Sequence, residues 1–145
     1  MPVEISREIQ DFLAGWQDDP LNARDAFTNY LSFLQGQPGV TLEFKARPGI
    51  SYSVRARHAA QQGRELFVLV DVVDDEPEIR WLSVCFYADM ITDPEEKGDF
   101  VPSGLMGEDA ACFNLDEDDP AMRDYISTRI AEAATAAGAT SRTGS

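Results

Sequence analysis

The sequence of 145 residues is poor in the side chains that catalytic sites most often use, because it contains one histidine and two cysteines. A serine or cysteine nucleophile needs a base beside it, and His58 is the only imidazole that could act as one. The segment "GLMGED" lacks the lysine of a phosphate-binding loop, and the histidine and cysteines do not match a zinc site. We therefore expect a non-enzymatic protein without a cofactor or a bound metal, since an enzyme would have only carboxylates for acid–base chemistry.

Positive charge is also scarce. The chain has 12 Lys and Arg residues against 26 Asp and Glu residues, a formal net charge of −14 and a sequence pI near 4.2. The electrostatic field of so negative a protein repels phosphate groups, so neither nucleic acid nor a membrane surface is expected as a partner. No apolar run reaches the roughly 18 residues that span a bilayer. The N-terminal "MPVEISREIQ" lacks the features of a signal peptide, so we expect a cytoplasmic protein.

The two cysteines each lie within an apolar stretch, Cys85 in "LSVCFYA" and Cys112 in "AACFNL". Apolar surroundings and a cytoplasmic location favour reduced cysteines that pack in the core. A disulfide or a reactive pair is the alternative interpretation.

Three segments have the apolar spacing of helices. The first is predicted over residues 3–15, where the apolar residues recur at helical intervals. An Asp-Pro pair at 19–20 predicts an N-cap and the first turn of a second helix, which Gly36 ends. The same pair at 119–120 begins the last helix, and Gly138 is its expected end.

Strict alternation of apolar and polar residues predicts two neighbouring strands, 40–47 and 50–57. The run "LFVLVDVV" is apolar at nearly every position, which predicts a strand in the centre of the sheet. Residues 89–110 are expected to be mostly loop, with room for a short helix or an edge strand. The five expected strands are residues 40–47, 50–57, 66–73, 79–88 and 111–115.

These elements predict an α+β fold. It consists of an antiparallel β-sheet of about five strands, with two N-terminal helices and one C-terminal helix packed on one side. A chain of this length fits one domain. We expect that domain to cover residues 1–138 and residues 139–145 to form a frayed tail.

The order of elements resembles a known group of small domains. It is carried by "DAFTNYLSFLQGQPGVTLEFKARPGISYSV", "ELFVLVDVV", "WLSVCFY" and "CFNLDEDDP", within residues 23–136. This order is similar to that of the YdhG-like and the double-wing YjbR/CyaY-like domains, many of unknown function. The resemblance implies an antiparallel sheet with helices on one side and supplies no catalytic residues. In the frataxin-type branch an acidic first helix binds iron, which would implicate Glu4, Glu8 and Asp11; a solvated helix face is the competing interpretation.

The segment "KARPGISYSVRARH" gathers much of the positive charge in the two alternating strands and contains no acidic residue. If the strands pair, Lys45, Arg47, Arg55 and Arg57 share the face opposite the apolar residues. With His58 they form the candidate binding site. The competing interpretation is an exposed surface that charge keeps soluble, or one that pairs with the chain's own acidic loops.

The connection between these two strands must contain an odd number of residues, because Phe44 and Tyr52 have to lie on one face. A two-residue Pro48-Gly49 loop would place Phe44 opposite Ser53. We therefore expect a bulge or a connection of about three to five residues.

Function follows from these observations only as a hypothesis. We expect a non-catalytic binding or interaction module, a homodimer, whose basic strands take an acidic group from a small ligand, another protein or a second copy. An acidic chaperone or adaptor is the first alternative, and it would expose a large apolar patch. A carboxylate-based metal-binding protein is the second.

Overall fold

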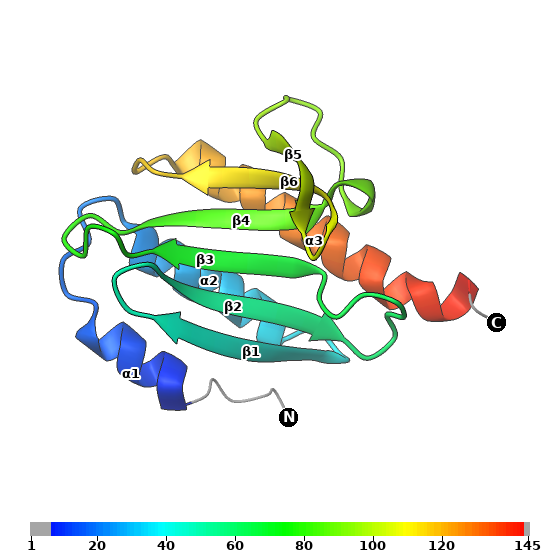
Figure 1. Cartoon of the computed structure of the whole chain (residues 1–145), viewed down its shortest axis with the longest axis horizontal. Helices are drawn as coiled ribbons and strands as arrows, with labels where there is room; N and C mark the ends of the chain where they lie inside the picture. Colours follow the sequence, from blue (N-terminus) through cyan, green and yellow to red (C-terminus); the bar gives the residue numbers. More distant parts are fainter. Residues whose placement is uncertain (1–6, 144–145) are drawn as a thin grey trace.

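The computed structural model describes residues 7–143, with side chains described through residue 139. Its centre is an antiparallel sheet of six strands in the order β1-β2-β3-β4-β6-β5 (Figure 1). One strand more than expected is present, because the 89–110 segment contributes an edge strand and part of its neighbour. The strands are β1 (Val40–Arg47), β2 (Ser51–His58), β3 (Val68–Val73), β4 (Trp81–Tyr87), β5 (Asp99–Leu105) and β6 (Glu108–Leu115).

The helices lie on one face of the sheet, as expected for the α+β class. Behind the sheet in Figure 1 lie α2 (Ala23–Gln35) and α3 (Pro120–Thr143). The first helix, α1 (Arg7–Gly15), packs through Phe12 against Phe44 and Tyr52, whose rings belong to the same face. The predicted start of α1 at residues 3–6 lies outside the described residues. A short 3-10 helix, η1 (Ala88–Met90), follows β4.

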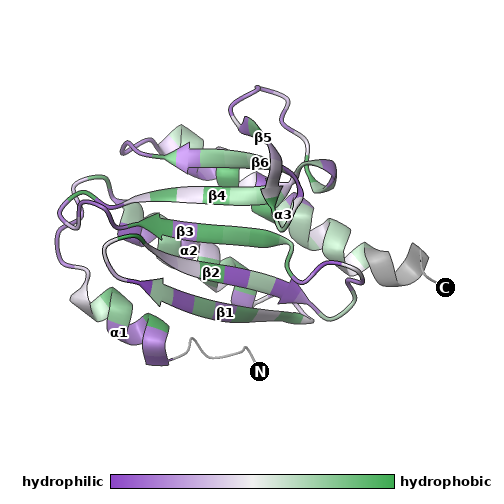
Figure 2. Cartoon of the chain, viewed as in Figure 1, coloured by the Kyte–Doolittle hydropathy of each residue, from purple (hydrophilic) through white to green (hydrophobic). Residues whose placement is uncertain are grey.

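Alternation along the strands explains which face the helices cover. Val54, Val70 and Val84 are fully buried beneath α2 and α3, and each buried side chain of this size contributes about 1.5–3 kcal/mol to folding. The intervening residues point to the opposite side, which carries none of the described helices and is called the open face below. β3 occupies a central position, as predicted, and Figure 2 shows apolar residues along nearly its whole length.

The Asp-Pro pairs begin the helices in two different ways. Asp119 accepts a hydrogen bond from the amide of Met122 at 3.1 Å, so it caps α3 as predicted. The second helix begins later than predicted, at Ala23 rather than at Pro20, because residues 20–21 form a turn. Asp19 nevertheless accepts hydrogen bonds from the amides of Ala23 and Arg24 across that turn.

The expected end of the last helix at Gly138 is wrong, because α3 continues to Thr143. Its small size serves packing instead: a Cβ at this position would lie 3.2 Å from Nε2 of His58. The predicted tail therefore begins as helix, and residues 144–145 lie outside the described part of the chain.

The β1–β2 hairpin confirms the parity argument. Arg47 lies opposite Ser51, so the connection consists of the three residues 48–50. Within it Gly49 has a φ of 84°, a conformation that glycine adopts without a steric penalty. The register keeps Phe44 and Tyr52 on the side covered by the helices.

The cysteines correct the sequence interpretation. Cys85 on β4 lies directly opposite Cys112 on β6, with a Cα–Cα distance of 4.1 Å, and the two form a disulfide. They face the open side of the sheet and not the main core. The expectation of reduced core cysteines is therefore wrong.

Candidate functional site on the open face

A continuous polar row crosses five strands of the open face. Each of its residues lies directly opposite the next in the neighbouring strand. From β1 to β6 the row consists of Lys45, Ser53, Asp71, Ser83 and Asn114. A strand buried on both faces would carry apolar residues here, so this row marks a surface that residues 7–143 leave without a covering layer.

Four cations of the candidate site lie on this face, and they are called the basic face below: Lys45, Arg47, Arg55 and Arg57. The fifth predicted residue, His58, does not join them. Its ring lies on the side covered by the helices, near Gly138 and 6.3 Å from the ring centroid of Phe67. Its Nδ1 accepts a hydrogen bond from the Ala60 amide, so the ring packs where the hairpin meets α3.

Most of the basic face lacks a carboxylate partner. Arg57 forms an ion pair with Glu43 at 3.2 Å, whereas Arg47 reaches only the Ser51 hydroxyl at 3.3 Å. The Nε of Arg55 is buried, and it has no hydrogen-bond partner within the described chain. Among described Lys and Arg side chains, those without a carboxylate within 4.0 Å are Arg24, Lys45, Arg47 and Arg55.

Two carboxylates lie beside the unpaired cations: Glu43 is directly opposite Arg55 in the β1–β2 register, and Asp71 lies at the centre of the polar row. Burial raises the pKa of Asp71 above the ordinary value, although the hydrogen bond from Ser53 and the charges of Arg47 and Arg55 lower it. Ionised Asp71 therefore interacts with two arginines without forming a close ion pair with either. The site still presents more positive than negative charge.

The other half of the open face is covered by the chain itself. The β5–β6 hairpin folds across the end of β4, as Figure 1 shows, and closes a small second core. That core consists of the buried residues Leu66, Tyr87, Leu105 and Ala110. We call this region the covered half.

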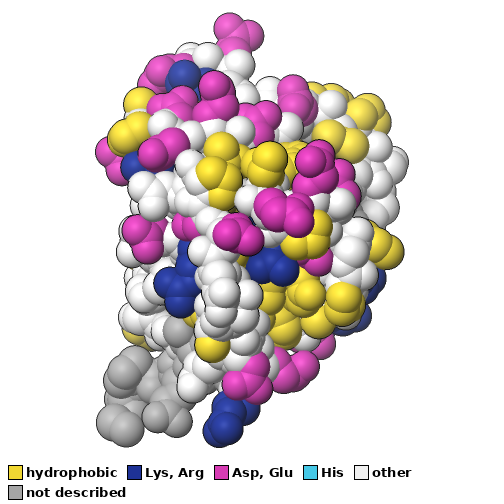
Figure 3. Space-filling view, turned by 90° about the vertical axis from the view of Figure 1, so that its left-hand side faces the viewer, with side chains coloured by type: hydrophobic (Ala, Val, Ile, Leu, Met, Phe, Trp, Pro, Cys, Tyr) yellow, Lys and Arg dark blue, Asp and Glu magenta, His cyan; other side chains and the backbone are white. Residues whose placement is uncertain are grey.

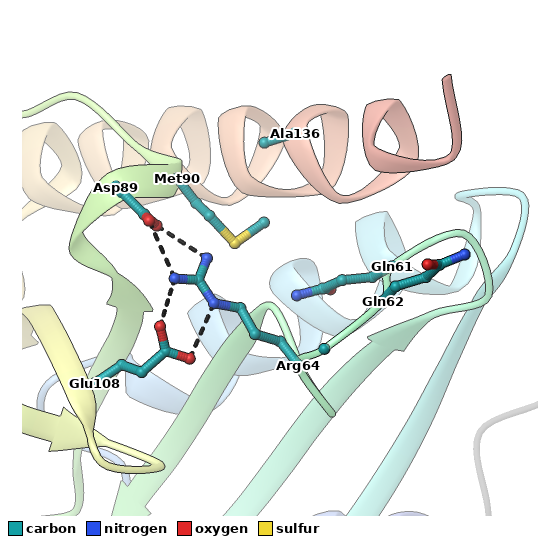
Figure 4. Close-up of a pocket in the computed structure, with 8 residues that line it drawn as sticks. Gln61, Gln62, Arg64, Asp89, Met90, Glu108 and Ala136 are labelled. Atoms are coloured by element: carbon teal, nitrogen blue, oxygen red, sulfur yellow. Dashed lines mark hydrogen bonds and ion pairs between the residues drawn. The ribbon is translucent and has the colours of Figure 1, made fainter. Parts of the chain in front are cut away.

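Arg64 holds the covered half closed. Its guanidinium donates four hydrogen bonds of 2.7–3.1 Å to Asp89 and Glu108 (Figure 4) and lies 4.1 Å from the ring centroid of Tyr87. The hydrogen bonds from Arg64 hold the pKa of both carboxyl groups below their usual range, so both are ionised at neutral pH. The three residues come from the β2–β3 connection, η1 and β6, which makes this cluster a clasp between distant segments.

A cavity of about 480 Å³ adjoins the clasp and is also lined by Gln61, Gln62 and Met90 (Figure 4). Its charged groups already satisfy one another, and two carboxylates outnumber one guanidinium. The cavity therefore suits a neutral or cationic polar molecule better than an anion. Nothing in its lining supplies a nucleophile with an adjacent base.

A buried ion pair fixes the opposite end of the sheet. Arg80 donates from Nε to Asp74 at 2.6 Å, and its guanidinium lies over the rings of Phe12, Trp16 and Tyr52 at 5.3–5.5 Å. Asp74 also accepts from the Gly49 amide. This carboxylate thus anchors the β1–β2 turn, and with it the basic face, to the β3–β4 connection.

Sequence reasoning missed Asp71, Asp74, Arg64 and Arg80. Asp71 had a visible signal, since it interrupts the apolar run "LFVLVDVV" in a central strand. The other three lie in connections, where a charged residue is ordinary. Only the folded chain brings them to their partners.

The carboxylate-based metal-binding alternative finds no supporting site among the described residues. Within residues 7–139 no group of three or more His, Cys, Asp or Glu side chains is arranged to hold a metal ion. On the first helix Asp11 pairs with Arg7 at 3.5 Å, and Glu4 lies outside the described residues.

Most of the exposed large apolar residues lie in the turns at one end of the sheet or on the β5–β6 hairpin. Ile50 and Ile79 lie in the turns at the end of the sheet shown in Figure 3, where hydrophobic side chains are interspersed with acidic ones. Phe100, Val101 and Met106 lie on the β5–β6 hairpin. The chaperone or adaptor alternative therefore stays a prediction.

Comparison of the chain with protein-family models, with curated proteins and with solved structures found no match. The resemblance to YdhG-like and YjbR/CyaY-like domains stays a prediction for that reason. Among the described helices, none has the length and apolar character needed to cross a bilayer.

Proposed function

We propose that this protein is a non-catalytic binding module whose basic face binds an acidic segment of a partner protein. The observation that carries the proposal is the set of unpaired cations. Lys45, Arg47 and Arg55 lack a carboxylate partner in a chain of net charge −14. In such a chain carboxylates are abundant, so leaving three neighbouring cations unpaired favours an external anion.

The geometry supports an extended acidic ligand. The cations lie on two adjacent antiparallel strands with regular register, on a surface that none of α1 to α3 covers. Adjacent strands are separated by about 4.8 Å, which is within reach of neighbouring carboxylates on one peptide. The rest of the molecule is acidic and repels the same ligand, so binding depends on docking at this face.

The experiment is an NMR titration of isotope-labelled protein with hexaglutamate, and in a second arm with inorganic phosphate. Amide shifts confined to β1 and β2 in the hexaglutamate arm support the proposal. A response to phosphate alone indicates a small-anion site instead and contradicts the peptide hypothesis.

Two variants sharpen the titration. Lys45→Glu with Arg55→Glu is expected to weaken hexaglutamate binding by about tenfold or more, because two attractive charges become repulsive. Arg7→Glu is the matched control, since it reverses an exposed cation on α1, away from the basic face. A loss per reversed charge that is equal in the two variants would show that only net charge matters, which would refute a defined site.

A further inference from the structure

The two edges of the sheet differ in how they meet solvent. Edge strands expose unpaired backbone groups, and proteins commonly blunt them with proline, bulges or irregular backbone. The β5 edge has such features: it contains Pro102, a positive φ of 55° at Ser103 and a register shift between Val101 and Leu105. The β1 edge has eight residues in unbroken register and no proline.

The outward backbone groups of β1 can be identified from the ladder. The Ala59 amide donates to the Gly39 carbonyl at 2.8 Å, in line with the β1–β2 register. Because antiparallel bonding alternates along a strand, the odd-numbered residues of β1 bond to β2. The amides and carbonyls of Leu42, Phe44 and Ala46 therefore point away from the sheet, on a side where the described chain places no strand.

We propose that β1 pairs antiparallel with β1 of a second copy, with Phe44 opposite the partner's Phe44 at a two-fold axis. The outward groups of both strands then face each other, as a ladder requires. Glu43 lies opposite the partner's Lys45, and the symmetry repeats this pair. The strand thus complements itself in charge as well as in backbone bonding.

Each of the two neighbouring registers places a pair of like charges directly opposite each other. The nearest registers that keep the outward backbone groups facing one another shift one strand by two residues along the other. In one direction this shift sets Glu43 opposite the partner's Glu43. In the other it sets Lys45 opposite the partner's Lys45 on the two-fold axis, although Glu43 then lies opposite the partner's Arg47. Like charges directly opposite each other destabilise a strand pair.

Pairing across this edge would join the two open faces on one side of a continuous sheet, because directly opposite residues point to the same face. The basic faces of the two copies would then lie next to each other across the two-fold axis. The pairing does not depend on the proposed ligand, since it rests on the edge alone. A failed peptide titration would leave it standing.

The experiment is sedimentation velocity of the intact protein from low to high micromolar concentration, at physiological salt. The wild type is expected to shift from monomer to dimer as concentration rises. Glu43→Lys is expected to weaken dimerisation by about tenfold or more, because two symmetric pairs become repulsive. The exchanged variant Glu43→Lys with Lys45→Glu restores opposite charges and is expected to dimerise again.

A backbone variant tests the ladder itself. Ala46→Pro removes an outward amide, and an edge strand tolerates proline where that amide faces solvent. The variant is expected to stay folded, as judged by circular dichroism, and to be monomeric. A wild type that stays monomeric at every concentration would overturn the proposal, as would a dimer indifferent to both Glu43→Lys and Ala46→Pro.

Hydrogen exchange tests whether the β1 edge is covered by a second copy or by another part of the same chain. The amides of Leu42, Phe44 and Ala46 are expected to become protected only as the dimer forms. Protection at the lowest concentration, in a protein that sediments as a monomer, would show that another part of the same chain covers the edge. That result would also overturn the proposal.

Discussion

The two halves of the open face present the same side of one sheet, yet the chain treats them in opposite ways. Over β4 and β6 it folds a hairpin, buries Tyr87 and Leu105, and surrounds Arg64 with two carboxylates. Over β1 and β2 the described residues add no layer, and three cations have no carboxylate within 4.0 Å. The charges of the covered half pair with one another within one molecule, whereas the basic face carries more positive charge than Glu43 and Asp71 balance.

The largest expected effect comes from Asp74→Ala, which removes the anchor beneath the basic face. The side chains of Arg80 and Asp74 are 12% and 4% exposed, so the variant leaves a guanidinium unpaired in a nearly dry site. Breaking such a buried pair costs about 3–5 kcal/mol of unfolding free energy. Urea denaturation measures the loss, and Asp75→Ala, at an exposed neighbouring carboxylate, is expected to change little.

Removing the Arg64 clasp of the covered half is expected to destabilise the fold less than Asp74→Ala does. Arg64→Ala is expected to lower Tm by about 2–4 °C at neutral pH, since its carboxylate partners are partly exposed. The pKa of both Asp89 and Glu108 is lowered in the folded state, so this stabilisation is present above their ordinary values and is lost as pH falls through the folded ones.

The Tm difference between wild type and Arg64→Ala should accordingly shrink as pH is lowered from 7 to below about 4. Contacts with Tyr87 do not titrate in that range, so part of the difference remains. A Tm difference that is constant with pH would mean that Arg64 acts through packing alone.

The smallest expected effect is that of Asp71→Asn. Burial raises the pKa of Asp71, so its contribution to stability is full at low pH and is lost as pH rises through the folded value. Asparagine does not titrate. The variant should therefore gain about 1–3 °C in Tm relative to wild type between pH 4 and pH 7.

The same substitution sharpens the comparison between the halves, because it removes the only carboxylate in the polar row. Hexaglutamate should bind Asp71→Asn more tightly than wild type. Weaker binding would mean that Asp71 positions the arginines and does not merely oppose the ligand.

Local pattern was sufficient for the first two strands and for their connection. The alternation in 40–47 and 50–57 fixes which strand residues face the helices, and parity then excludes a two-residue loop. The alternation does not fix burial: Ile50 is exposed in the turn, whereas Ser51 and Ser53 are buried on the open face.

The same alternation placed the cations of the basic face on one side. The inclusion of His58 in the candidate site did not follow this alternation. As the residue after Arg57, His58 points to the side covered by the helices.

The disulfide and the clasp could not be predicted in this way, because they depend on sheet order. Nothing local shows that β6 inserts between β4 and β5, and only that order sets Cys85 opposite Cys112. Gly138 shows a related limit. Its sequence context predicted the end of a helix, whereas in the fold the His58 ring lies where a side chain at this position would be.

The disulfide also changes the topology of the covalent chain. Residues 86–111 form the interior of a closed ring, which includes η1, β5 and the tip of the β5–β6 hairpin. A protease that cut the mostly exposed 92–98 segment would open this ring without releasing a fragment, until a reductant severed the second connection. The whole basic face lies on the N-terminal arm outside the ring, and α3 forms the other arm.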